Sequence, residues 1–198
     1  MLSPPRTTEP RETSTVTRER PSWLQAAQDH WKHRGDDRPP FAVPPGDGQE
    51  SVWDYPRPPV LVADQRAVVV ADDLGPLVRT HAALRVLETA SPPTFYVPIA
   101  DTAMDRLVAA AGQSFCEWKG PASYWALAHA PELPVAWSYP RPFEPFEGLV
   151  DHLGFYPGRV RCTVDGEVVR PQDGGFYGGW ITEEIIGPFK GEADTSGW

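Results

Sequence analysis

From residue 60 onward the apolar stretches of this chain are short, and turn-forming residues break them. The stretch VLVADQRAVVVADDLGPLV (60–78) alternates β-branched runs with Asp and Gly-Pro, and an Asp-Gly pair (165–166) separates CTV from EVV. Such runs, spaced about every ten residues, are typical of strands joined by tight turns. They argue against an alternating βαβ fold. We expect a mainly β fold: a compact single domain of short antiparallel strands in a tent-like, sandwich-like or barrel-like arrangement.

Composition divides the chain into four parts. Residues 1–20 contain Pro, Thr, Arg and Glu with almost no apolar mass, and we expect a disordered leader because little burial would offset the cost of ordering it. Residues 21–35 predict a short amphipathic helix. Residues 36–59 are rich in proline, which removes backbone donors and favours an extended linker. Residues 60–198 form the expected β domain, with a Gly-rich and aromatic C-terminal extension from about residue 171.

The N-terminal helix carries a stripe of large aromatic side chains. Ser22 followed by Gln25 is a capping-box pattern, and Gly35 can end the helix. Trp23 and Trp31 share one face, and this stripe is too large to be left in water without a reason. It docks either on the protein's own domain, on a second copy in a homo-oligomer, or on a separate partner protein.

Net charge and hydropathy restrict the partners and the cellular compartment that we expect for this protein. The net charge is −9, and almost all of it lies in residues 60–198. Because phosphate backbones need a basic face, nucleic acid is disfavoured as a partner. No run of 18 apolar residues is present for a membrane span, and residues 1–10 lack the apolar core of a secretion signal. We expect a cytoplasmic protein with no membrane partner.

The two cysteines do not form a metal-binding pattern. Cys116 and Cys162 make neither a Cys-x-x-Cys pair nor a four-ligand set. Structural zinc usually takes four Cys or His ligands, so we expect no metal site and no cofactor. In a reducing compartment both residues are expected to be free thiols.

A dense group of aromatic residues surrounds one lysine, Lys119. Aromatic rings provide flat apolar faces and the lysine provides one positive charge, so together they can bind an aromatic or anionic small molecule. The alternative is that the rings form a core and Lys119 closes a turn before Gly120. A lysine against aromatic walls could also form a Schiff base if its pKa were lowered. The candidate ligand-binding residues are Glu88, Tyr96, Cys116, Lys119, Tyr124, Trp125, Trp137, Tyr139, His152 and Tyr156.

Two further pairings involve these residues. Glu88 ends an apolar run and is expected either to be solvated or to form an ion pair with Lys119. Cys116 could act as a nucleophile if His152 supplied the base, although an isolated cysteine is more often a small buried apolar residue.

Four motifs in fixed order carry a family resemblance. They are ALRVLETASPPTFYVPIAD (83–101), SFCEWKGPASYW (114–125), VAWSYPRP (135–142) and DHLGFYPGRV (151–160). Together, over residues 60–198, they resemble the bacterial and fungal Domain of Unknown Function 427 family, and GGFYGGWITEEIIGPFKG (174–191) is similar to the tail of one branch of it. Glu117 departs from the family pattern, in which a proline is common there.

The resemblance implies a small, mostly β, single domain, and the family has been grouped with nucleotidyltransferases and with tent-like folds that carry zinc. The residues of this sequence support neither a nucleotidyltransferase activity nor a zinc site. A transferase needs paired carboxylates for magnesium, whereas the adjacent Asp72 and Asp73 would point to opposite faces of a strand. Zinc in tent-like folds needs two cysteine pairs.

Three functions therefore remain open, and the sequence does not decide whether the protein is an enzyme. The first is a β domain that binds, and could transform, an aromatic or anionic small molecule around Lys119. The second is a non-catalytic interaction module that uses the Trp-rich N-terminal helix. The third is the nucleotidyltransferase that the family grouping implies.

Overall fold

The computed structural model describes residues 21–191, 194–195 and 197–198, so the expected disordered leader (1–20) lies outside the described residues. One α-helix, α1 (Trp23–Asp29), precedes the strands. The strands are β1 (Glu50–Ser51), β2 (Val60–Asp64), β3 (Val68–Asp72), β4 (Gly75–Thr80), β5 (Ala83–Glu88), β6 (Ser91–Pro98), β7 (Leu107–Cys116), β8 (Gly120–Leu127), β9 (Ala130–Ser138), β10 (His152–Phe155), β11 (Arg161–Val164), β12 (Glu167–Val168), β13 (Arg170–Pro171), β14 (Trp180–Ile181) and β15 (Ile185–Ile186).

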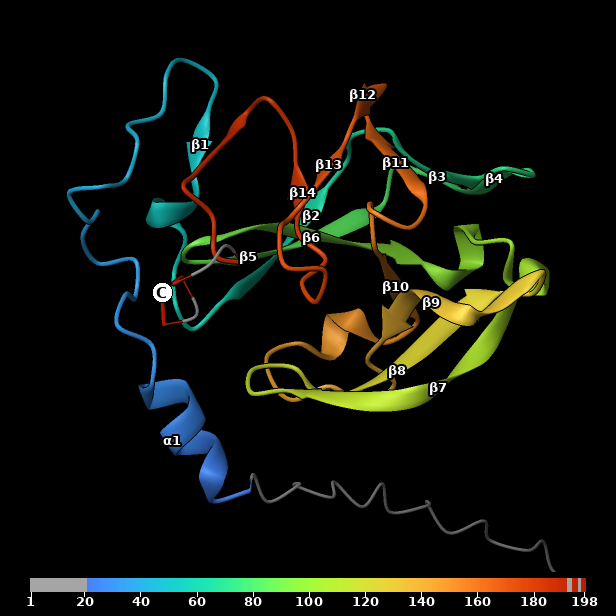
Figure 1. Ribbon diagram of the computed structural model, residues 1–198, viewed down its shortest axis with the longest axis horizontal. Coiled ribbons are helices and arrows are strands. Elements are labelled where there is room, and N and C mark those ends of the chain that lie inside the picture. Colours follow the sequence, from blue (N-terminus) through green and yellow to red (C-terminus); the bar gives the residue numbers. More distant parts are fainter. Residues whose placement is uncertain (1–20, 192–193, 196) are drawn as a thin grey trace, which may run out of the picture.

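Most strands belong to two antiparallel sheets (Figure 1). The larger sheet has seven strands in the order β2-β5-β6-β10-β9-β8-β7, and the smaller has four in the order β12-β11-β3-β4. Two short pairs, β13–β14 and the parallel β1–β15, complete the fold. The expected mainly β fold of short antiparallel strands is confirmed. Among the described residues there is no helix with the length and apolar character needed to cross a membrane.

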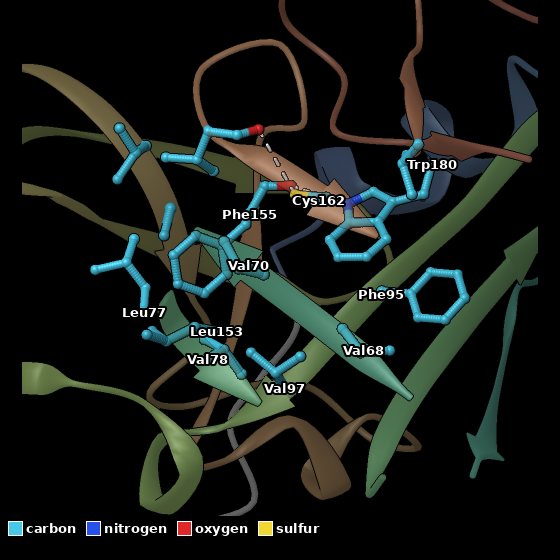
Figure 2. Packing of buried hydrophobic residues seen from close by; sticks show 14 of the residues in the cluster. Val68, Val70, Leu77, Val78, Phe95, Val97, Leu153, Phe155, Cys162 and Trp180 are labelled. Carbon is cyan, nitrogen blue, oxygen red and sulfur yellow. Dashed lines mark hydrogen bonds between the residues drawn. The ribbon is translucent and has the colours of Figure 1, made fainter. Parts of the chain in front are cut away.

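The main core fills the space between the two sheets (Figure 2). Alternation along the short strands explains it: Val68 and Val70 on β3 are fully buried, while the residues beside them are partly exposed. The larger sheet contributes Phe95, Val97, Leu153 and Phe155 from β6 and β10. Cys162 lies in this core as a free thiol, whereas Cys116 lies elsewhere, also free.

The segment that we expected to be a linker, residues 36–59, differs from that expectation at its C-terminal end. Val52 and Trp53 are fully buried, and strand β1 pairs with β15 near the other end of the chain. The indole Nε1 of Trp53 donates a hydrogen bond to the carbonyl of Pro188 at 3.0 Å. Apolar side chains between the prolines supply enough burial to hold this segment on the domain, so the packed structure begins before residue 60.

The C-terminal extension is likewise part of the core. Trp180 of β14 is fully buried, stacks on Phe95 with ring centroids 4.8 Å apart and donates a hydrogen bond from Nε1 to the carbonyl of Phe155. Figure 2 shows this indole beside the β6 and β10 side chains. The extension therefore supplies interior packing as well as surface.

The N-terminal helix is shorter than the predicted 21–35 and lies on the protein's own domain. Ser22 makes no side-chain capping hydrogen bond, and α1 ends at Asp29. The Nε2 of Gln28 donates to the carbonyl of Glu117 at 2.9 Å, and the Nε1 of Trp31 donates to the Glu117 carboxylate at 2.9 Å. Trp23 remains 52% exposed and meets only the edge of Phe115 among the ring contacts of the described residues. The two tryptophans of the stripe therefore have different environments.

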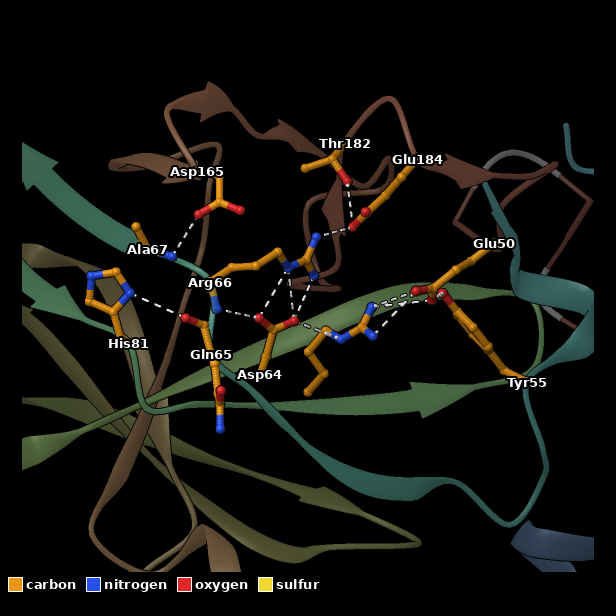
Figure 3. A network of polar contacts seen from close by, with 11 residues as sticks. Glu50, Tyr55, Asp64, Gln65, Arg66, Ala67, His81, Asp165, Thr182 and Glu184 are labelled. Carbon is orange, nitrogen blue, oxygen red and sulfur yellow. Dashed lines mark hydrogen bonds and ion pairs between the residues drawn. The ribbon is translucent and has the colours of Figure 1, made fainter. Parts of the chain in front are cut away.

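A charged network joins the N-terminal segment, the larger sheet and the C-terminal extension (Figure 3). Arg66 forms ion pairs with Asp64 at 2.6 Å and with Glu184. Arg85 of β5 lies between Asp64 and Glu50, with nitrogen–oxygen distances of 3.0 and 3.2 Å. Because these residues are far apart in sequence, the network holds both ends of the chain against the sheet.

This network predicts a loss of stability in acid. Burial alone would raise the pKa of Asp64 and of Glu50, but hydrogen bonds from their partners outweigh it, and both pKa values are lowered from their ordinary 3.8 and 4.5. A carboxyl group with a lowered folded-state pKa contributes stability above its ordinary value and loses it as the pH falls through the lowered one. We therefore expect the melting temperature to fall on acidification below about pH 4.

This prediction is tested by comparing the variant Arg85→Met with the control Arg79→Met. The control removes an exposed arginine on β4. Arg85→Met should cost about 2 kcal/mol near neutral pH, since it removes charge-assisted contacts, and should make the acid dependence shallower. Arg79→Met should change neither quantity. If thermal melts gave identical pH profiles for wild type and Arg85→Met, the role of the Arg85 ion pairs in acid stability would be contradicted.

Candidate functional site

A cavity of about 160 Å³ lies against the larger sheet. Its walls come from the sheet, from the turn between β7 and β8, and from the C-terminal extension. The lining residues are Val86, Glu88, Ser91, Pro92, Thr94, Tyr96, Ser114, Phe115, Cys116, Glu117, Lys119, Tyr124, Trp137, Tyr139, Tyr156, Gln172, Phe176, Tyr177, Gly178 and Lys190.

Strand register explains the aromatic floor of this cavity. Tyr96, Gly154, Trp137 and Tyr124 are successive cross-strand partners on β6, β10, β9 and β8. Directly opposed residues of adjacent strands share one face of a sheet, so these four positions form a row across it. Two more tyrosines follow the ends of β9 and β10, Tyr139 and Tyr156. The result is a wall with flat ring faces and hydroxyl groups.

Two glycines leave the space that the Trp137 ring occupies. A Cβ at Gly154 would lie 2.6 Å from Trp137 Cζ2, and a Cβ at Gly178 would lie 2.1 Å from Cη2. Both distances are far below a van der Waals contact, so neither position accepts a larger residue unless the ring moves. The Nε1 of Trp137 donates a hydrogen bond to the Tyr96 hydroxyl at 3.2 Å. Both the sheet, at Gly154, and the C-terminal extension, at Gly178, thus pack closely on the Trp137 ring.

Lys119 is 8% exposed and lines the cavity. Its Nζ lies 5.9 Å from the centroid of Tyr139 and 5.8 Å from that of Phe146. Burial alone would lower the pKa of Lys119, but electrostatic interactions with Cys116, Tyr96 and Glu88 outweigh burial, and the pKa is raised. The side chain is therefore a protonated ammonium at neutral pH.

The ion pair expected between Glu88 and Lys119 is not present, because Glu88 has a different partner. Arg57 is almost fully buried, and its Nε lies 3.3 Å from the Glu88 carboxylate. Arg57 belongs to the segment that composition alone assigned to a linker. Among the ion pairs of the described residues, none includes Lys119.

Eight of the ten candidate residues from the sequence line this one cavity, and two do not. Trp125 follows Tyr124 on β8 and therefore points to the opposite face, where its Nε1 donates to Ser138 Oγ at 3.1 Å and its ring packs on the main core. His152 does not line the cavity; its Nδ1 lies 2.9 Å from the carbonyl of Val150.

Cys116 lines the cavity without His152, so the proposed cysteine–histidine pair is not assembled there. Burial raises the pKa of the Cys116 thiol, which disfavours the reactive thiolate. Within the described part of the chain, no cluster of three or more His, Cys, Asp or Glu is placed to hold a metal ion.

Sequence reasoning missed Lys190, a second buried lysine of the cavity. It is 4% exposed, and its Nζ lies 3.4 Å from the ring centroid of Trp31 and 4.9 Å from that of Tyr177. Burial is the main cause that lowers its pKa to about 8. The local signal in the sequence is a single lysine, between Phe189 and Gly191, in a tail rich in glycine and aromatic residues.

These features define a small β protein with an aromatic-walled cavity that contains two buried lysines. A family model described as Domain of unknown function (DUF427) matches residues 60–166, which is more than half of the chain. The chain belongs to this family. A comparison with curated proteins finds no match. The matched region contains the sheet and Lys119, whereas Trp31, Arg57 and Lys190 lie outside it.

Proposed function

We propose that this domain binds a small aromatic anion, such as a one-ring carboxylate, in the cavity around Lys119. The observation that carries the proposal is the buried ammonium of Lys119, which lies beside aromatic rings and takes part in none of the ion pairs among the described residues. A buried charge is costly unless it is compensated. An anionic ligand would supply that compensation, and its ring would pack on the aromatic floor.

The charges around the cavity support an anion over a cation. The charged residues in its described lining are two carboxylates, Glu88 and Glu117, and two lysines. Glu88 is already paired with Arg57, and Glu117 accepts the hydrogen bond of Trp31. Together with Arg57, which pairs with Glu88 and lies outside the described lining, the two lysines give three cations against two carboxylates, and the excess of one positive charge favours a ligand with a single negative charge.

The size of the cavity supports a one-ring ligand over a nucleotide. A cavity of about 150 Å³ is large enough to hold benzene, and this one measures about 160 Å³. A nucleoside triphosphate is several times larger. The adjacent Asp72 and Asp73 are outside this cavity, and Asp72 pairs with Arg106, so they do not support a magnesium–triphosphate site here.

The hydrogen bond from Trp31 to the protein's own Glu117 supports docking of Trp31 on the protein's own domain over its recognition by a separate partner.

Titration calorimetry with benzoate tests the proposal. Wild-type protein is expected to bind it saturably, and Lys119→Met should weaken binding at least tenfold, since a charge-assisted contact is worth about 1.5–3 kcal/mol. Lys32→Met is the matched control, because it makes the same change at an exposed lysine and should bind as wild type does.

Thermal melts of both variants check that the fold is retained. If wild type does not bind benzoate, or if folded Lys119→Met binds it equally well, the proposal is wrong.

A further inference from the structure

Lys190 and Lys119 line the same cavity in different chemical environments. The pKa of Lys119 is raised, so its amine stays protonated. Lys190 instead lies over the faces of Trp31 and Tyr177, and the guanidinium of Arg57 is 4.7 Å from the same Trp31 ring. A second cation at one ring disfavours protonation of the lysine, so the cavity holds one fixed positive charge and one amine that can lose its proton.

The neutral form of Lys190 is accessible near neutral pH. Burial is the largest cause of its lowered pKa of about 8, Arg57 acts in the same direction, and Glu88 and Glu117 oppose both. About one amine in ten is then neutral at pH 7, against fewer than about one in a thousand for an ordinary lysine. Cation–π attraction acts on the ammonium only, so a neutral amine is no longer held to Trp31 and can turn toward the cavity.

The backbone around Lys190 fixes where the amine emerges. The Lys190 amide donates to the carbonyl of Ala90 at 2.7 Å, and its own carbonyl accepts a hydrogen bond from Gln172 Nε2 at 2.5 Å. Both partners are buried. The side chain therefore extends from an anchored backbone at the cavity wall and not from a free tail.

We propose that Lys190 forms an imine with an aldehyde or ketone group of the bound molecule, which makes the ligand a small aromatic carbonyl compound whose carboxylate lies at Lys119. This inference rests on the proposed function, because Lys119 and the aromatic floor position the carbonyl group. A buried lysine beside another cation is a recognised way to obtain a nucleophilic amine.

The reaction balances without an oxidant or a reductant. The lone pair of the neutral Lys190 nitrogen attacks the carbonyl carbon, and the carbonyl π electrons move to oxygen to give a carbinolamine. Two protons leave the nitrogen in the course of the reaction, and both end on the departing oxygen. The products are one C=N bond and one molecule of water.

Borohydride trapping with para-carboxybenzaldehyde tests the inference on the full chain. This probe has one ring, one carboxylate and one aldehyde. Peptide mapping by mass spectrometry after reduction near neutral pH should find the adduct on Lys190, with at least tenfold less on Lys119 and on the exposed Lys32. Excess benzoate should suppress the labelling, because it occupies the same cavity.

The variants are Lys190→Arg, which keeps the positive charge but cannot form the imine, and Lys32→Arg as the matched control. Lys190→Arg should lose at least nine-tenths of the adduct, and Lys32→Arg should keep it. Mapping of the wild-type protein is decisive even if Lys190→Arg does not fold. Labelling spread evenly over the three lysines, or no adduct at all, would overturn the inference.

The outcomes also separate this inference from the proposed function. Benzoate binding without an adduct on Lys190 would overturn the imine and leave the anion site intact. An adduct on Lys190 in a protein that does not bind benzoate would support the reactive amine and overturn the anion site at Lys119.

Discussion

Replacing Trp53 with alanine is expected to lower the free energy of unfolding by about 3–5 kcal/mol, the usual cost of removing a large buried aromatic side chain. The Trp53 ring is fully buried, and it makes edge contacts with Phe41 and Trp198 at 5.0 and 5.2 Å between ring centroids. The substitution also leaves the Pro188 carbonyl without its hydrogen bond from the indole. Chemical denaturation followed by circular dichroism measures the change.

Trp23→Ala is the matched control, since it removes the same side chain from an exposed position of the same N-terminal region. It should change stability by less than about 1 kcal/mol. A fragment beginning at residue 60 should be less stable than the full chain for the same reason as Trp53→Ala. If this fragment were as stable as the full chain, the conclusion that residues 50–59 stabilise the domain by packing on it would be wrong.

Trp180→Ala is expected to have an effect of the same size, about 3–5 kcal/mol, although the residue lies beyond the part of the chain that the family model matches. Its indole stacks on Phe95 between the sheets, and its Nε1 donates to the Phe155 carbonyl. Removal creates a cavity and leaves a buried acceptor without that donor. Denaturant titration of full-length protein measures the loss.

Phe176→Ala is the control from the same extension, because its ring is 65% exposed. It should leave the denaturation midpoint nearly unchanged. A Trp180→Ala midpoint equal to that of Phe176→Ala would show that the extension only covers the surface.

The β character of the domain could be predicted because the signals for it are local. Short β-branched runs and the Asp-Gly turn are present in the sequence, and the turn joins β11 and β12 as expected. The packing of residues 50–59 could not be predicted in the same way. Prolines gave this segment the composition of a linker, whereas its burial depends on Pro188 and β15, more than 100 residues away in the chain.

The residues of the candidate site also fall into those that local patterns predict and those that depend on distant contacts. Tyr124 and Trp137 could be placed together because strand alternation and register follow from local patterns. Alternation also excludes Trp125 from the cavity, although the sequence could not say which of the two neighbours would face it. Arg57 and Lys190 were missed because their partners come from distant segments, and no spacing rule links a proline-rich stretch to a Gly-rich tail.

The cavity wall is divided between the family region and the C-terminal extension, and the N-terminal segment contacts the extension at Lys190, which has an evolutionary consequence. A relative that shares only the counterpart of residues 60–166 would inherit the sheet and the lysine equivalent to Lys119. It would lack the counterparts of Lys190, which carries the second amine, and of Trp31 and Arg57, which lie beside it. Under the two proposals made above, such a relative would bind the anion but would not form the imine, so a change at the ends of the chain would add a reaction while the sheet stayed the same.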